Sequence, residues 1–239
     1  MTVAPGGSAT PGLAGRFREA GLRVLELPGG RTRRPWSEGE LAELFADADA
    51  IVAMPGQRYP RELLEAANRL RLITSGVIGV DHIDVEAASE LGILVANCPT
   101  RENVVGVAEA TVMLTVALLL RLEEKQEALR SGRWRPGAVG HLLRGRTVGL
   151  IGYGRIGRAV HERLQGWEVQ VQYHDPYAED STDLDTLLST SDVVSLHVVL
   201  TAETRGLLGP RELGLMKPSA VLVNTSRGGT VDEAALAEA

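Results

Sequence analysis

Three glycines with the spacing Gly152-x-Gly154-x-x-Gly157 separate an apolar run from a stretch of helical character. The preceding residues, Thr147–Ile151, have the composition of a buried β-strand. In such an arrangement the first glycine permits a tight turn, the second lets a phosphate approach the backbone, and the third allows the helix to pack closely. The free N–H groups and the positive dipole end of the helix then attract the phosphates. The spacing therefore predicts a site for the pyrophosphate of a dinucleotide.

An acidic residue, Asp175, ends the next β-like stretch, about 20 residues after the glycines, where a dinucleotide site needs a carboxylate for the ribose. A carboxylate accepts hydrogen bonds from the ribose 2′-OH and repels a 2′-phosphate. We therefore expect NAD rather than NADP as the cofactor. Because Asp175-Pro176 is also a turn sequence, a purely structural role at the end of the strand is the alternative.

The composition of the 239 residues argues against several classes of protein. The formal net charge of −6 and the scattered Lys and Arg residues indicate no nucleic-acid surface. The single cysteine, Cys98, forms no internal disulfide and the N-terminus lacks a signal-peptide pattern, so we expect a cytoplasmic protein. The apolar run Val104–Leu120 contains Gly106 and Glu109 and is short for a bilayer span, so we expect a buried helix and no membrane association. We also expect no bound metal.

Short β-like runs alternate with amphipathic or alanine-rich segments, which indicates an α/β fold with parallel sheets. Two such series are joined by a long helix, which we expect to begin with Asn103 as its N-cap. We interpret the start of the chain, rich in Gly, Pro and Ser, as a loop in which only Met1–Ala4 could supply a further strand. The expected strands are Leu22–Leu27, Ala50–Ala53, Leu70–Thr74 and Ile93–Asn97 in the first series, and Thr147–Ile151, Val169–His174, Asp192–Val198 and Ala220–Thr225 in the second. The expected helices include Glu38–Phe45, Arg61–Ala67, Val85–Leu91 and one that begins at Leu184.

Five segments occur in a fixed order, "GVDHIDVEAASELGILVANCP", "VAEATVMLTVALLLR", "LRGRTVGLIGYGRIGRAV", "SDVVSLHVVLTAETRGLL" and "LMKPSAVLVNTSRGGTVDEAAL". From about Leu22 to Ala239 the chain resembles the D-isomer-specific 2-hydroxyacid dehydrogenases, a family that includes D-3-phosphoglycerate dehydrogenase. The resemblance implies two Rossmann-like or flavodoxin-like parallel-sheet domains. Residues 1–102 would form a flavodoxin-like substrate domain with an abbreviated N-terminal strand, and residues 103–239 an NAD-binding Rossmann domain that lacks its last strands. In the sheet order 3-2-1-4-5-6, the first four strands are then present and strand 4 is an edge.

By this resemblance Arg227 is the catalytic arginine, which binds the substrate carboxylate and polarises the carbonyl while hydride passes between substrate and nicotinamide. A guanidinium also suits this role on chemical grounds, because it pairs with a carboxylate through two hydrogen bonds and stays charged. The alternative is a surface arginine in the turn before Gly228-Gly229. The resemblance implies further cofactor contacts beside the three glycines and Asp175, through the backbone amides of Arg155 and Ile156 and through the nicotinamide-side residues Val198, Thr225 and Ser226.

The loop after the third expected strand matches the segment that holds the substrate carboxylate with its backbone amides in the family. It consists of Gly76, Val77, Ile78 and Gly79. Backbone N–H donors suit an anion, and glycine allows a close approach. The same loop could equally be a simple strand-to-helix turn, and Val77 stands where the family usually has a glycine.

The chain stops at Ala239, before the segments that carry the family's catalytic glutamate and histidine, whereas His197 matches a structural histidine of the family. We therefore expect an NAD-dependent oxidoreductase of the 2-hydroxyacid dehydrogenase type, which acts on a small 2-hydroxy or 2-oxo acid, but whose 239 residues as written lack turnover. The alternative is a noncatalytic, NAD-binding regulatory or corepressor-like interaction protein on the same scaffold. We also expect a homodimer.

Overall fold

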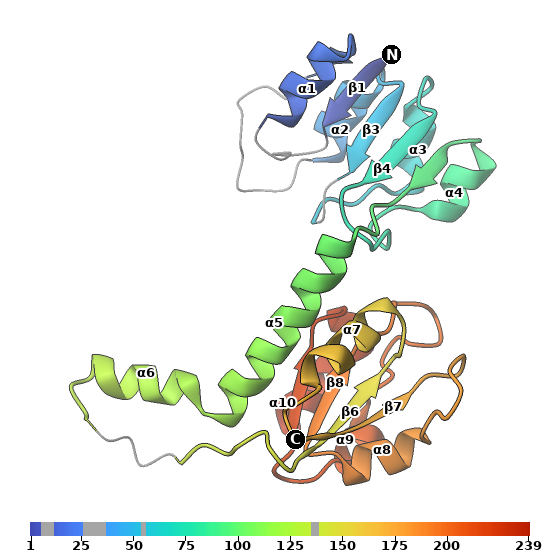
Figure 1. Cartoon of the computed structure of the whole chain (residues 1–239). Helices are drawn as coiled ribbons and strands as arrows, with labels where there is room; N and C mark the ends of the chain where they lie inside the picture. Colours follow the sequence, from blue (N-terminus) through green and yellow to red (C-terminus); the bar gives the residue numbers. More distant parts are fainter. Residues whose placement is uncertain (6–11, 26–36, 54–55, 135–138) are drawn as a thin grey trace. The chain divides into compact units, whose positions relative to one another are not determined.

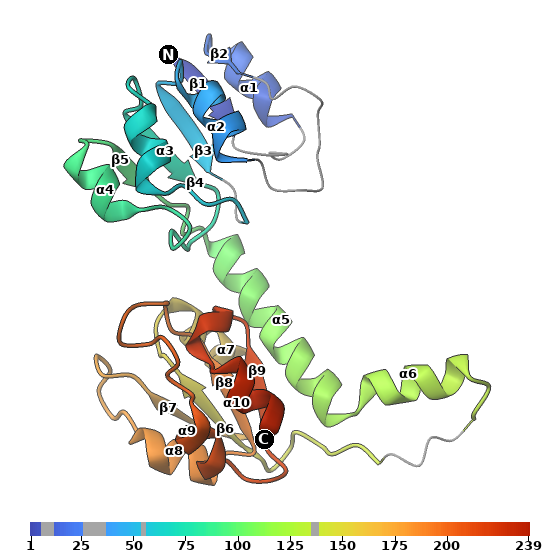
Figure 2. The ribbon, with the colours of Figure 1, turned by 180° about the vertical axis from the view of Figure 1, so that it is seen from behind.

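The computed structural model describes residues 1–5, 12–25, 37–53, 56–134 and 139–239. The chain divides into two compact units, Met1–Thr100 and Arg101–Ala239, each built on one parallel sheet (Figures 1 and 2). The α/β fold class with two parallel sheets is confirmed. The units divide two residues before the boundary that the sequence predicts, because helix α5 (Arg101–Leu119) begins at Arg101 and not after Asn103.

The sheet of the first unit has the flavodoxin-like order β2-β1-β3-β4-β5. Helix α1 covers one face, and helices α2 to α4 cover the other. The short strand that Met1–Ala4 could supply is present as the interior strand β1 (Thr2–Pro5), and residues 6–11 of the expected loop lie outside the described residues. Part of the expected strand Leu22–Leu27 also lies outside them. The strands are β1 (Thr2–Pro5), β2 (Arg23–Val24), β3 (Ala50–Ala53), β4 (Leu72–Ser75) and β5 (Leu94–Ala96), and the helices are α1 (Leu13–Glu19), α2 (Glu38–Phe45), α3 (Arg61–Ala66) and α4 (Val85–Glu90).

The sheet of the second unit has the order β7-β6-β8-β9. Its strands are β6 (Thr147–Ile151), β7 (Gln170–His174), β8 (Val193–Leu196) and β9 (Val221–Asn224). Helices α5 and α7 pack on one face, and α8 and α9 pack on the other. The remaining elements and helix bounds are α6 (Leu122–Arg130), α7 (Arg155–Leu164), α8 (Leu184–Thr190), α9 (Pro210–Leu215), the 3₁₀ turn η1 (Gly228–Thr230) and α10 (Glu233–Glu238).

The order of the second sheet corrects one expectation. The order 3-2-1-4 would place the third strand beside the second, whereas β8 pairs with β6. Crossovers between parallel strands are right-handed, so the face on which the connecting helix lies decides to which side of the previous strand the next strand is added. Two successive helices on opposite faces therefore add their strands in opposite directions across the sheet. Because α7 and α8 lie on opposite faces, the chain crosses back over β6 to form β8. Strand β9 is nevertheless an edge, as expected.

Helix α5 is exposed along much of its length, so the expectation of a buried helix is wrong. Within this helix the buried residues are Ala108, Thr111, Thr115 and Leu119. By length and composition, α5 could cross a bilayer, and it is the one such helix among the described residues. A single helix of this kind is weak support for a membrane span. The helix packs on α7 and β9 of its own unit, and Glu109 forms an ion pair with Arg163 of α7 at 3.5 Å. It ends before Arg121, whose φ of +52° begins α6.

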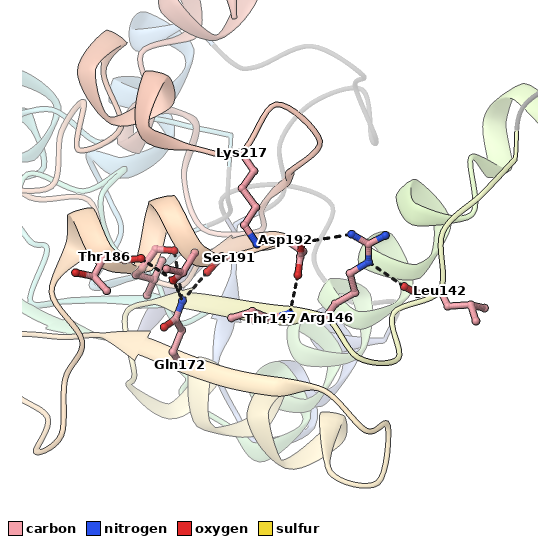
Figure 3. Close-up of polar contacts among 10 residues, drawn as sticks. Leu142, Arg146, Thr147, Gln172, Thr186, Ser191, Asp192 and Lys217 are labelled. Carbon is pink, nitrogen blue, oxygen red and sulfur yellow. Dashed lines mark hydrogen bonds and ion pairs between the residues drawn. The ribbon is translucent and has the colours of Figure 1, made fainter.

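An aspartate joins the starts of neighbouring strands in the second unit. Asp192, just before β8, accepts a hydrogen bond of 2.9 Å from the amide of Thr147 in β6. Its carboxylate also pairs with Lys217 at 3.1 Å and with Arg146 at 3.3 Å (Figure 3). Burial of the Asp192 carboxyl raises its pKa, but the hydrogen bonds from Thr147 and Lys217 and the charge of Arg146 outweigh burial and leave the pKa below its ordinary value. Asp192 thus ties together the segments that begin β6, β8 and β9.

The first unit uses the same arrangement at the equivalent place. Asp49 lies just before β3 and accepts a hydrogen bond of 2.6 Å from the amide of Thr2, the first residue of β1. Arg69, from the segment before β4, pairs with Asp49 at 2.9 Å. The hydrogen bonds from Thr2 and Arg69 hold the pKa of Asp49 below its ordinary value. Each sheet therefore has a charged anchor between its first and third strands in chain order.

The substitution Asp192→Asn keeps the shape of this anchor and removes its charge. We expect it to lower the free energy of unfolding of the second unit by about 2 kcal/mol at neutral pH, as for other hydrogen bonds to charged groups. The folded pKa of Asp192 is lowered, so its contribution is complete above the ordinary pKa of about 4 and is lost as the pH falls through the folded value. Denaturant unfolding followed by circular dichroism should show the difference at neutral pH and a smaller one in acid.

A matched control is Asp185→Asn, which breaks the ion pair between Asp185 and Arg211. These side chains are 46% and 64% exposed, so the loss should stay below about 1 kcal/mol. A loss at Asp185 as large as that at Asp192 would contradict the assignment of Asp192 as an anchor.

Candidate functional site

The glycine turn after β6 is shaped by two close backbone approaches. Gly152 has a φ of +94°, and a Cβ there would lie 2.8 Å from the carbonyl carbon of His197 at the end of β8. A Cβ on Gly157 would lie 2.3 Å from the carbonyl oxygen of Gly152. A Cβ on Gly154, by contrast, would have no heavy atom of the described residues within 4 Å. The outer glycines are therefore required by packing, and the middle glycine borders open space.

That open space lies at the N-terminus of α7. Gly154 is the N-cap, and no side-chain hydrogen bond caps the helix within the described chain. The first-turn amides, which include those of Arg155 and Ile156, lack intrahelical acceptors in any α-helix. Amides and dipole together suit a phosphate, so the turn fits the pyrophosphate of a dinucleotide.

Tyr153, between the first two glycines, is fixed through both its backbone and its side chain. Its amide donates to Asp175 Oδ2 at 2.7 Å, and its carbonyl accepts from Arg158 Nε at 3.0 Å. Its ring stacks on Tyr173 with the centroids 3.7 Å apart, and its hydroxyl lies 2.6 Å from His161 Nδ1. Burial raises the pKa of the Tyr153 phenol above its ordinary value, so the ring is neutral at pH 7. The turn is thus ordered by its own contacts.

Asp175 occupies the end of β7 and connects two loops. Oδ2 binds the Tyr153 amide, and Oδ1 accepts a hydrogen bond of 2.9 Å from the amide of Tyr177. The Asp175 amide donates to Ser181 Oγ at 2.9 Å. The Asp175 carboxylate therefore stabilises the turn after β7 and also lies beside the glycine turn. Each of its oxygens can accept a further hydrogen bond from a ribose hydroxyl. Sequence reasoning did not find the bond to Tyr153, because it joins residues from separate strands.

Arg227 follows β9 in a turn, and its side chain is half-buried. Its Nη1 donates to the carbonyl of Ser226 at 2.9 Å. The hydroxyl oxygen of Thr225, the residue after β9, lies 2.9 Å from the hydroxyl oxygen of Thr111 in α5. Since β6, β8 and β9 are successive neighbours in a parallel sheet, their carboxyl ends share one edge. The second unit therefore brings Gly152–Gly157, Val198 and Thr225–Arg227 to that edge.

His197 lies at the same edge, but its imidazole is not in the charged imidazolium form at neutral pH. Burial lowers its pKa to about 4. Its Nε2 lies 2.9 Å from Ser195 Oγ, and Nδ1 is buried without a hydrogen-bond partner among the described residues. The ring is therefore neutral at pH 7.

The predicted carboxylate loop belongs to the first unit, where it follows β4. Ser75 Oγ donates to the carbonyl of Gly79 at 3.3 Å and accepts from the amide of Val77 at 3.4 Å. Asn97 Nδ2 donates to the carbonyl of Ile78 at 2.8 Å. Gly76 is exposed, and a Cβ there would meet nothing within 4 Å in the described chain. The carbonyls of the loop are thus held by protein groups.

A model of the family "D-isomer specific 2-hydroxyacid dehydrogenase, NAD binding domain" matches residues 112–239. The glyoxylate reductase of Thermococcus litoralis is 40% identical over 223 residues, which cover 84% of this chain and 66% of that protein. The chain belongs to the D-isomer-specific 2-hydroxyacid dehydrogenase family. The second unit is accordingly an NAD-binding domain of these dehydrogenases, and NAD is the cofactor.

Two further relatives extend this comparison. The D-3-phosphoglycerate dehydrogenase of Methanocaldococcus jannaschii is 38% identical over 235 residues, 93% of this chain and 45% of that dehydrogenase. The crystal structure of an NAD-dependent formate dehydrogenase from Staphylococcus aureus in complex with NAD shares 33% identity, with a TM-score of 0.86 over 99% of this chain and 76% of that one. The chain thus spans about half to two thirds of the length of the two curated relatives.

Gly154→Val places a side chain where the pyrophosphate would approach. We expect the variant to melt like the wild type, because the Cβ meets no described atom, and to bind NAD about 100-fold more weakly, from the loss of charge-assisted hydrogen bonds. Calorimetry measures the affinity, and Gly214→Val, in open space on α9, is the control. A folded Gly154→Val protein with wild-type affinity would refute the assignment of the turn.

Substitutions of Asp175 separate its charge from its bond to the turn. Asp175→Asn keeps an acceptor for the Tyr153 amide but removes the charge, so NAD should bind about 10-fold more weakly and NADP should gain relative to NAD. Asp175→Ala also removes the acceptor and should weaken both nucleotides. Asp180→Asn, an exposed site in the same loop, is the control. Wild-type protein that binds NADP at least as well as NAD would contradict the charge argument.

Proposed function

We propose that this protein is an NAD-dependent dehydrogenase of small 2-hydroxy acids, which interconverts such an acid and the corresponding 2-oxo acid. The observation that carries the proposal is the position of Arg227. Its turn follows β9, while the glycine turn follows β6, and β8 alone separates these two strands in the sheet. A permanently charged guanidinium is thus available at the sheet edge that fits the dinucleotide.

In this proposal the Arg227 guanidinium binds the substrate carboxylate through paired hydrogen bonds and polarises the adjacent carbonyl. Bound NAD would accept or deliver the hydride. The loop Gly76–Gly79 remains a predicted anion site of the first unit, because the exposed Gly76 permits an anion to approach the backbone. The names of the relatives, glyoxylate reductase and D-3-phosphoglycerate dehydrogenase, support a 2-hydroxy or 2-oxo acid as the substrate class.

Proton transfer needs a group beyond those described above. Reduction of the carbonyl leaves an alkoxide, and a positioned acid typically contributes ~10² to 10⁴ in rate. Arg227 does not release its proton readily, and His197 is neutral at pH 7 because burial lowers its pKa to about 4. We therefore expect the 239 residues, assayed alone, to bind nucleotide and 2-oxo acid with negligible turnover. The same result for turnover is expected of a noncatalytic, NAD-binding regulatory protein, so substrate binding distinguishes the two.

Calorimetric titration of the chain, first with NADH and then with glyoxylate, tests the proposal. We expect glyoxylate to bind the NADH complex and Arg227→Gln to weaken that binding at least ~10-fold, from the loss of charge-assisted hydrogen bonds. NADH affinity should change little. Arg130→Gln, an exposed arginine of α6, is the control. NADH binding without any response to glyoxylate, pyruvate or hydroxypyruvate would favour the regulatory alternative and contradict the dehydrogenase.

We also propose that the protein is a homodimer joined through α5 and the segment after it. The exposed face of α5 carries Met113, Leu114 and Leu118, with exposures between 38% and 62%. Helix α6 follows α5 after the turn at Arg121 and extends away from the sheet of its unit (Figures 1 and 2), and it exposes Leu122 and Leu129. Exposed apolar patches of this kind mark interfaces.

An apolar cavity beside α5 supports a second copy as the partner. It has a volume of about 250 Å³, and Val116, Leu120, Leu142 and Trp167 contribute to its lining. One unit thus presents both protruding apolar side chains and an apolar recess. A two-fold axis would use both on each copy, as a self-complementary interface requires.

Light scattering after size-exclusion chromatography should give the mass of a dimer. Leu118→Glu should give the 25.6 kDa monomer, because an unpaired carboxylate would be buried in the interface. Leu236→Glu, at a 43% exposed leucine of α10, should remain a dimer. A wild-type monomer, or a Leu118→Glu dimer, would contradict the proposed interface.

A further inference from the structure

Asn224, the last residue of β9, commits its whole carboxamide to the turn that carries Arg227. Its Oδ1 accepts hydrogen bonds from Ser226 N at 3.0 Å and from Ser226 Oγ at 2.7 Å. Its Nδ2 donates to the carbonyl of Arg227 at 2.9 Å and to Thr230 Oγ1 at 3.2 Å. These contacts use both ends of the amide, although Asn224 itself is exposed. An exposed side chain with this many local bonds acts on the turn around it.

Thr230 holds the same turn from the interior. It is fully buried, and its hydroxyl donates to the carbonyl of Arg227 at 2.7 Å while its amide donates to that carbonyl at 3.1 Å. The carbonyl of Thr230 in turn accepts a hydrogen bond of 3.1 Å from the amide of the buried Leu208. The Arg227 carbonyl thus has three donors, and one of the two residues that supply them is bonded to the core.

Arg227 has an unstrained backbone, so the hydrogen bonds to its carbonyl are not needed to hold an unfavourable conformation. Its φ of −139° and ψ of 139° are ordinary extended values. Its guanidinium contacts the turn through Nη1, which donates to the carbonyl of Ser226. Binding of a carboxylate through two parallel hydrogen bonds depends on orientation, so a backbone fixed at the carbonyl of Arg227 would pre-orient the side chain.

We propose that Asn224 and Thr230 are positioning residues that fix the backbone of Arg227 for carboxylate binding. The inference rests on the proposed function, because Arg227 is there the group that binds the substrate. Neither side chain needs to touch substrate for this role.

The test uses Thr230→Val, which removes the hydroxyl without changing the volume, Thr230→Ser, which restores it, and Asn224→Ala. The probe is oxamate, an unreactive 2-oxo acid analogue, titrated into the complex of the chain with NADH. We expect Thr230→Val and Asn224→Ala to bind oxamate about 10-fold more weakly and Thr230→Ser to recover wild-type affinity. NADH affinity should stay unchanged in the two Thr230 variants, whose side chain does not contact Ser226. Thr201→Val, which removes an exposed hydroxyl bonded to Thr204, is the control.

A second readout does not depend on the substrate. Backbone ¹⁵N relaxation should give Arg227 an order parameter near ~0.85 in the wild type and a value below ~0.6 in Thr230→Val and Asn224→Ala, with recovery in Thr230→Ser. A rigid Arg227 in the folded variants, or wild-type oxamate affinity in them, would overturn the positioning role. A wild type that binds no oxamate, together with the expected loss of order, would support the positioning role and overturn the proposed substrate class.

Discussion

The close approach of the glycine turn to the end of β8 determines where the groups of the second unit lie. A Cβ at Gly152 would be 2.8 Å from the backbone of His197, so the turn rests directly on the neighbouring strand. This neighbour is β8 and not the next strand in the chain, because α7 and α8 cover opposite faces of the sheet. The N-terminus of α7 consequently lies at the carboxyl edge, where ligands bind in open α/β sheets. Arg227, after β9, reaches the same edge one strand further along.

The two edges of each sheet are chemically different. At the amino edge, Asp192 in one unit and Asp49 in the other accept a strand amide and pair with cations from nearby segments. Their charges are satisfied within the fold, so they contribute to stability. At the carboxyl edge of the second unit, the space at Gly154 and the uncapped start of α7 leave donors for a ligand. Stability and binding are therefore assigned to opposite ends of the same strands.

The sequence predicted helices and strands with the correct bounds where the hydrophobic pattern clearly had either the helical or the strand period. Helix Glu38–Phe45 and strand Thr147–Ile151 occur with the expected bounds, and the Gly152 motif lies between a strand and a helix as the pattern indicates. A strand at Met1–Ala4 was expected and occurs at Thr2–Pro5, but its hydrophobic pattern is too short to indicate where in the sheet it lies. Its interior place comes from pairing with β2 and β3, which no local pattern reveals. The exposed face of α5 was missed because its residues are apolar on nearly all sides, so composition alone suggested burial.

The candidate site was predictable as a set of motif residues but not as a bonded structure. The sequence indicated Asp175 as a carboxylate for ribose, yet its bond to the Tyr153 amide depends on the pairing of β6 with β7. Asn224 lies within the motif that carries Arg227, and its position three residues earlier was the available signal for a turn-forming side chain. Neither bond follows from spacing, because each requires the turn geometry that the sheet imposes.

Hydrogen–deuterium exchange of the whole chain with and without NAD tests most directly whether the carboxyl edge of the second sheet is the binding edge. The account predicts slower exchange in peptides that cover residues 152–158 and 225–231 when NAD is present. Peptides that contain Arg146, Asp192 and Lys217, at the opposite edge, should exchange at the same rate in both samples. Protection confined to the opposite edge, or no protection at residues 152–158 at saturating NAD, would contradict the account.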